Sequence, residues 1–298
     1  MVRLKLSLEL SYEIFGAPGD FIFNLHAAQT NHQTVVAEDL FISQPVESQL
    51  HTVAESRNRY LRVTARPGPL TVRYSATVDI RHHVTVPEDV PEVPVASLPP
   101  QTLPYVYPSR YCQSDRLGRL AIREFGHLPM GYGRVRAIRD WVNGRIAFTS
   151  NSSNATTSAT DTLVDQAGVC RDFAHLMIAL CRAVNIPARF TTGIDFGADP
   201  TLGPTDFHAY VEAFLGGRWY MFDPSGTAIP MGFVRFGTGR DAADVAFATI
   251  FGSVASRAPV IHVEAIQDAS RQFVMPYHRA EALSTDAGDF AGGGRAGS

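Results

Sequence analysis

The sequence predicts an α+β protein in which an antiparallel β domain precedes a second domain of helices and strands. Residues 2–10 alternate apolar and polar side chains, which is the period of a strand with one buried face. Residues 86–104 contain six prolines, a spacing that excludes a regular helix or a central strand. Beyond them, apolar residues recur at helical spacing, and two strand-like runs flank the pair Gly216-Gly217.

The first domain is expected over residues 1–85. The alternation continues in FIFNLHA, RYLRVTA and LTVRYSATVDI, between turn sequences such as GAPGD and RPGP, so a β-sandwich-like domain is expected. Because proline has no backbone N–H to donate, residues 86–104 are expected to form a linker or an extended arm on the second domain, outside any continuous central sheet.

The second domain is expected over residues 105–280. The segment SDRLGRLAIREF has Ser114 as a helix cap, and GRVRAIRDWVNGRI places Val135, Ile138 and Val142 on one helical stripe. Residues 281–298, rich in glycine and small polar residues, are expected to be a flexible tail.

Composition narrows the class of protein. The chain has 298 residues and is 45% hydrophobic, so it can bury one or two cores. Its formal charge of −3 gives no electrostatic reason to expect nucleic acid or an acidic membrane as a partner. Neither a signal-peptide block nor a stretch of transmembrane length is visible. The three cysteines fit a reducing compartment, so a cytoplasmic location is expected.

Cys170 is the candidate nucleophile. It stands in AGVCRDFAHLMIAL, at the start of a run so apolar that a helix there must be buried. Gly168 is expected to adopt backbone angles closed to other residues, which would leave Cys170 in the first helical turn, where free amides and the helix dipole favour thiolate. The alternative is a small buried side chain. Cys181 is interpreted as core, and Cys112 has no activating neighbour.

The hairpin around Gly216-Gly217 supplies a base and a carboxylate. If the turn has two residues, Tyr210 lies opposite Asp223, so His208, Tyr210, Glu212 and Asp223 share one face. His208 and Asp223 are then diagonal neighbours, and a hydrogen bond of about 2.6–3.2 Å between them is expected. Alone, His208 would be a surface strand residue and Asp223 a turn former; with Cys170 they suggest a nucleophile, a base and an orienting carboxylate.

The order GVCRDFAHLMIALCRAVNIPARF, DFHAYVEAF, GRWYMFDPSG resembles the transglutaminase-like superfamily, especially its bacterial two-domain members with an N-terminal β region. The resemblance covers residues 105–226. It implies a papain-like α+β core, with the thiol helix packed on an antiparallel sheet, and a catalytic triad of Cys170, His208 and Asp223. Neither Trp141 nor Trp219 aligns with the tryptophan that serves as an oxyanion donor in eukaryotic members.

The expected activity is acyl transfer from an amide of a peptide or protein, through a thioester, with water favoured over an amine as acceptor. The alternative is a non-catalytic binding or structural module on the same scaffold. No cofactor or metal is expected. Cys170, His175 and His208 do not have the sequence spacing of metal ligands, and His175 is interpreted as a core residue. Arg110, Tyr111 and Ser150 could line a pocket but are interpreted as ordinary loop residues, and the oligomeric state stays open.

Overall fold

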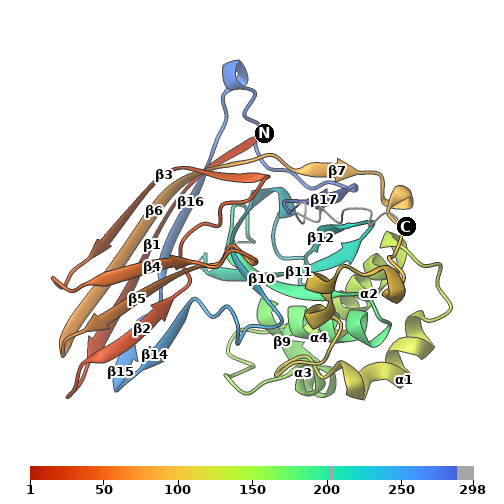
Figure 1. Ribbon diagram of the computed structural model, residues 1–298, viewed down its shortest axis with the longest axis horizontal. Coiled ribbons are helices and arrows are strands. Elements are labelled where there is room, and N and C mark those ends of the chain that lie inside the picture. The colour runs from red at the N-terminus through yellow and green to blue at the C-terminus, as the bar shows by residue number, and fades with distance from the viewer. Residues whose placement is uncertain (200, 202–204, 287–298) are drawn as a thin grey trace, which may run out of the picture.

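The computed structural model describes residues 1–199, 201 and 205–286. Its N-terminal part is a sandwich of two antiparallel sheets, seen side by side in Figure 1. One sheet contains β1 (Val2–Ile14), β3 (Gln33–Ile42), β6 (Gly68–Ile80), β15 (Val254–Ser256) and β16 (Val260–Ile266). The other contains β2 (Gly19–Phe23), β4 (Ser48–Thr52), β5 (Arg59–Ala65) and β14 (Ala248–Phe251). Every second residue of β1 is buried, which confirms the alternation predicted for this strand.

The strands β14, β15 and β16 come from a distant part of the sequence. Both β15 and β16 pair with β1, and β14 pairs with β2; in Figure 1 these blue strands lie beside the red ones. The expected division placed all of residues 105–280 in the second domain, whereas residues 248–266 complete the sheets of the first. Without them β1 and β2 would present open edges, and the returning segment satisfies their backbone groups.

The proline-rich arm lies on the second domain. It forms three short 3₁₀ helices, η1 (Pro87–Asp89), η2 (Val95–Ser97) and η3 (Pro100–Tyr105). Between them, the carbonyl of Pro91 accepts a 2.8 Å hydrogen bond from the amide of Gly216, and Glu92 forms an ion pair with Arg134. Within the described residues, the arm meets a strand in an isolated bridge from Glu92 to Leu215, so it is not part of a continuous sheet.

The expected tail begins with ordered structure. β17 (Ala282–Ser284) pairs with β7 (His83–Thr85), and its three residues are buried. The expectation of a flexible tail is therefore wrong for these residues, because Ala282 and Leu283 add to the hydrophobic cores. The remainder of that expectation, residues 287–298, lies outside the described residues.

The second domain is built on a four-stranded antiparallel sheet, in the order β12-β11-β10-β13. Its strands are β10 (Ala188–Asp195), β11 (Phe207–Leu215), β12 (Arg218–Phe222) and β13 (Phe233–Gly239). The helices are α1 (Ser114–Phe125), α2 (Tyr132–Arg145), α3 (Ala159–Asp165) and α4 (Cys170–Ala183), and a short parallel pair joins β8 (Ala147–Phe148) to β9 (Ala167–Gly168). Ser114 is the first residue of α1 and Gln113 its N-cap, so Ser114 is not the cap expected.

Helix α4 is the centre of this domain. It packs against β10 and β11 and contacts the other three helices, and every residue from Asp172 to Arg182 is buried, as expected for a helix that is apolar almost all round. On the sheet, Ile194, Val234 and Phe236 join the core of the N-terminal sandwich. The sheet is thus covered on both sides, and β10 is buried along its whole length. Among the described residues, none of the helices is long and apolar enough to cross a membrane.

Candidate active site

Helix α4 begins at Cys170, as predicted. The carboxylate of Asp172 accepts a 2.9 Å hydrogen bond from the amide of Val169 and so caps the helix. Gly168 is needed for a different reason from the one expected: its φ is not in the left-handed region, but a Cβ there would lie 2.8 Å from the Asp172 Cβ. The glycine therefore makes room for the capping side chain, and the half-buried Cys170 follows in the first turn.

The hairpin has the predicted register. Leu215 pairs with Arg218, and the turn residues Gly216 and Gly217 have φ of +54° and +84°, angles that favour glycine. Val211 pairs with Phe222, and both join the core around α4, so His208 and Asp223 belong to the alternate set of positions, as the parity predicted.

His208 and Asp223 are brought together, at a longer distance than expected. His208 Nε2 lies 3.5 Å from Asp223 Oδ1, beyond the predicted 2.6–3.2 Å hydrogen bond. Asp223 Oδ1 instead accepts hydrogen bonds from the Ser225 amide at 2.9 Å and the Ser225 hydroxyl at 2.6 Å. The Ser225 hydroxyl is itself 3.5 Å from His208 Nε2. Ser225 therefore fixes the carboxylate, a role the sequence did not indicate.

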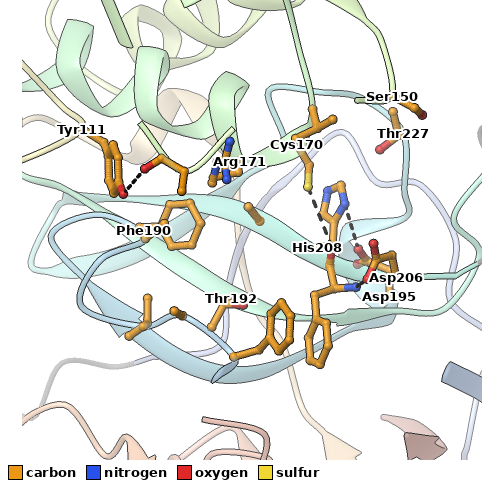
Figure 2. A pocket seen from close by; sticks show the side chains of 18 of the residues that line it. Tyr111, Ser150, Cys170, Arg171, Phe190, Thr192, Asp195, Asp206, His208 and Thr227 are labelled. Carbon is orange, nitrogen blue, oxygen red and sulfur yellow. Dashed lines mark hydrogen bonds and ion pairs between the residues drawn. The ribbon is translucent and has the colours of Figure 1, made fainter. Parts of the chain in front are cut away.

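Cys170 approaches His208 from the start of α4. Figure 2 shows the thiol pointing toward the imidazole, and its Sγ lies 3.9 Å from the carbonyl oxygen of Phe207. Burial would lower the pKa of His208, but the charges of Asp195 and Cys170 and the hydrogen bond to Asp223 hold that pKa well above its ordinary value. The imidazole is thus kept protonated beside the sulfur at neutral pH.

A second carboxylate, on Asp195, faces the same imidazole. Asp195 ends β10, and its Oδ2 lies 3.7 Å from His208 Nδ1. Its Oδ1 accepts a 3.0 Å hydrogen bond from the hydroxyl of Tyr210. The pairing of Gly193 with His208 brings Asp195 here, because residues two apart on a strand share a face. The sequence contains no turn that would fix the register of β10 against β11, so this residue was missed.

The thiol and the imidazole line a cavity of about 710 Å³, whereas Asp223, Ser225 and Tyr210 do not line it. Cys170, His208 and Asp195 form one part of its wall. The cavity is also lined by Arg110, Tyr111 and Ser150, so the interpretation of these three as ordinary loop residues is wrong. In Figure 2, Phe190 and Thr192 of β10 lie between Tyr111 and His208, and Ser150 lies on the side of Cys170.

His175 is a core residue, as interpreted from the sequence. It is fully buried, its Nε2 accepts a 3.1 Å hydrogen bond from the amide of Ala242, and its ring stacks on Tyr111 at 4.9 Å. Burial lowers the pKa of His175 to about 3, so it stays neutral. Trp141 and Trp219 lie outside the cavity, packed against Phe125 and Phe214 respectively.

Glu212 shares the predicted face but not the cavity. It is fully buried and forms ion pairs with Arg189 and Arg235. Both arginines also pair with Asp286, which follows β17. This buried ionic cluster of Arg189, Glu212, Arg235 and Asp286 joins the sheet to the last described residues of the chain.

Alkylation of the folded protein is expected at Cys170 and not at the other two cysteines. Cys112 and Cys181 have no exposed surface, and burial raises the pKa of Cys112 to about 12 and that of Cys181 further. Peptide mapping after brief treatment with iodoacetamide at neutral pH measures this. Unfolding in urea should make all three cysteines reactive, and faster labelling of Cys112 or Cys181 in the folded protein would contradict the assignment.

Comparisons with known proteins agree with this architecture. Sequence profiles of two families match the chain: the Transglutaminase-like superfamily over residues 122–224, and the N-terminal domain of bacterial transglutaminase over residues 2–101. A crystal structure from Cytophaga hutchinsonii, of a protein named as a candidate cysteine protease, is 38% identical, covers 95% of this chain and 97% of that one, and superimposes with a TM-score of 0.88.

Two curated relatives match over shorter stretches. The uncharacterized protein ML0607 of Mycobacterium leprae is 32% identical over 117 residues, which are 38% of this chain and 42% of that protein. The uncharacterized protein YebA of Bacillus subtilis is 28% identical over 144 residues, 41% of this chain and 19% of that protein. This chain spans less than half the length of either. From the profile matches and the likeness along nearly the whole chain to a solved structure, the protein belongs to the transglutaminase-like superfamily.

Proposed function

We propose that this protein is a cysteine-dependent enzyme that cleaves an amide of a peptide or protein through a thioester on Cys170. The observation that carries the proposal is the meeting of three elements at one imidazole, beside a cavity that Cys170 and His208 line. The start of α4 supplies a thiol, β11 supplies an imidazole held protonated, and the end of β12 leads into a carboxylate that Ser225 fixes in place. These are the parts of an activated nucleophile, its acid–base partner and an orienting group.

The reaction would proceed in two steps. In the first, Cys170 Sγ attacks the carbonyl carbon of the amide, and the C–N bond breaks while His208 gives its proton to the departing amine. In the second, water attacks the thioester, His208 takes a proton from that water, and the carboxylic acid leaves as the sulfur is freed. Asp223 orients the imidazole in both steps.

The start of α4 also offers a donor for the oxyanion. The amide N–H of Cys170 belongs to the first turn, where no preceding helical carbonyl can accept it. The positive end of the helix dipole lies at the same place. A carbonyl oxygen that becomes negatively charged beside Cys170 would be stabilised there.

The cavity fits a peptide better than a small polar metabolite. Its wall includes the aromatic and aliphatic side chains of Phe148, Phe190 and Val245, and its rim carries charges on Arg110 and Asp199. Apolar walls bind side chains, and the few charged groups set their orientation. The substrate class we propose is therefore a peptide or protein amide.

Hydrolysis is expected to exceed transfer to an amine, because water is always present and nothing in the sequence specifies an amine-binding subsite. A peptide library containing internal glutamine and lysine would be incubated with the protein in heavy-oxygen water, with and without excess primary amine. Mass spectrometry separates carboxylic acid products, which take up one heavy oxygen, from amine-linked products. Mainly amine-linked products would overturn the preference for water.

The same experiment tests the proposal itself. The matched control is Cys170→Ala, which keeps the helix and removes the sulfur, and it should form neither product. Turnover that persists in Cys170→Ala would contradict the proposal. Peptide binding by the wild-type protein with no turnover and no thioester would favour a non-catalytic binding module instead.

A further inference from the structure

Asp195 has a buried carboxylate oxygen that no ordinary structural role accounts for. Its side chain is 1% exposed, and Oδ1 is satisfied by the hydroxyl of Tyr210. Within the described part of the chain, Oδ2 has no hydrogen-bond donor. A buried acceptor without a donor costs free energy. The nearest charged partner of Oδ2 is Nδ1 of His208, at 3.7 Å.

The two ring nitrogens of His208 therefore each face a carboxylate. Asp223 stands 3.5 Å from Nε2 and Asp195 stands 3.7 Å from Nδ1. A neutral imidazole has one N–H and one lone pair, whereas the imidazolium has two N–H donors. While both carboxylates are ionised, only the imidazolium can donate to both of them, since in the neutral ring one carboxylate would face a lone pair. The arrangement is built for the protonated form.

The charged and titratable groups around the ring act in the same direction. Cys170 approaches from α4, Asp195 from β10 and Asp223 from the end of β12, and each raises the pKa of His208 against the effect of burial. Asp206, which precedes β11, adds a further negative charge, and Tyr210 on β11 packs edge to face on the imidazole, with centroids 5.0 Å apart.

We infer that Asp195 is a positioning residue that faces the Nδ1–H group of His208 as a hydrogen-bond acceptor and holds the imidazolium in place beside Cys170. The inference rests on the proposed function. In the resting site the sulfur and Asp195 both attract the protonated ring. Once the sulfur has bonded to the carbonyl carbon it carries no charge, and Asp195 is then the anion that holds the ring until Nδ1 gives its proton to the departing amine.

Burial raises the pKa of Asp195 itself to about 7, an effect to which the like charge of Asp223 adds, while His208 and the hydrogen bond from Tyr210 oppose it. The charge of Asp195 is therefore lost as the pH falls through neutrality. His208 loses its proton at the opposite, alkaline end of the range. The attraction between the Asp195 carboxylate and the His208 imidazolium is thus expected to be strongest on the alkaline side of neutrality.

The test is Asp195→Asn, which keeps the shape of the side chain and removes its charge. The probe is iodoacetate, which is an anion. The positive charge of the His208 imidazolium favours its reaction with Cys170, so the rate of alkylation falls as His208 loses its proton. We expect the alkaline limb of this rate profile to move to lower pH by about 1–3 units. The NMR titration of the His208 imidazole protons should move by the same amount. Tyr210→Phe, which removes the donor to Asp195 Oδ1, should move both in the same direction by less.

The matched control is Asp39→Asn. Asp39 is an exposed carboxylate on β3 of the N-terminal sandwich, outside the cavity, so the change in total charge is the same. Its profile should coincide with that of the wild-type protein. If the wild-type protein shows fast alkylation of Cys170 but Asp195→Asn leaves both profiles in place, the inference about Asp195 is wrong and the proposed function stands. A wild-type protein with no fast alkylation contradicts the proposed function.

Discussion

Replacing His208 by glutamine is expected to lower the rate of amide cleavage by about 10²- to 10⁴-fold, the usual contribution of a positioned acid–base group. Glutamine retains a polar side chain but can neither accept nor return a proton. Glutamine is close to histidine in size, so the fold should persist. Initial rates with a cleaved library peptide, measured at saturating and limiting concentration, give kcat and kcat/KM, and we expect the loss mainly in kcat.

The pH dependence has a defined sign. The pKa of His208 is raised, so the imidazolium is present at neutral pH and is lost as the pH rises through that raised value. Alkylation of the wild-type protein by iodoacetate should therefore be fast at neutral pH and slow in the alkaline range. In His208→Gln the neutral rate should collapse, and what remains should rise only where ordinary thiols ionise, at about pH 8.5.

The control is His262→Gln. His262 lies exposed on β16, in the N-terminal sandwich, and its replacement should change neither kinetics nor the pH profile. If His208→Gln cleaves peptides as fast as the wild-type protein, another group must return the proton to the amine. The role given to His208 would then be wrong, whatever the fold.

The sequence was sufficient where a local rule connects residues to geometry. A two-residue turn of Gly216 and Gly217 determines the register of β11 and β12, and that register alone places His208 and Asp223 at matching positions. The apolar run after Cys170 likewise marks a buried helix and its first residue. Both predictions depend on short stretches of chain, in which one or two residue types are decisive.

The sequence was insufficient where distant segments meet. Asp195 reaches His208 through the pairing of β10 with β11, and eleven residues separate these strands in the sequence, so no two-residue turn predicts their register. Residues 248–266 pair with β1 and β2, although their sequence does not predict which strands they pair with. The distance from His208 to Asp223 also depended on a competing hydrogen bond from Ser225, which the parity of a hairpin does not determine.

The ionic cluster beneath the sheet leads to a second large effect, on stability. Glu212 is fully buried, and the side chains of Arg189 and Arg235 are 7% and 3% exposed. Replacing Glu212 by alanine leaves two buried guanidinium groups with Asp286 as their remaining carboxylate in the cluster. Removing one partner of a buried ion pair typically costs about 3–5 kcal/mol, and we expect the free energy of unfolding to fall by that amount.

Urea unfolding at neutral pH, followed by circular dichroism, measures this loss as a lower midpoint at similar slope. Glu212→Gln keeps the volume of the side chain. The loss in the free energy of unfolding that it shares with Glu212→Ala is therefore electrostatic, and the remainder in Glu212→Ala is a cavity effect. The matched control is Glu264→Ala on the exposed face of β16, opposite Lys5, where a change of no more than about 0.5 kcal/mol is expected. If Glu212→Ala and Glu264→Ala cost the same, Asp286 alone balances both arginines, and the cluster does not hold the end of the chain against the sheet through Glu212.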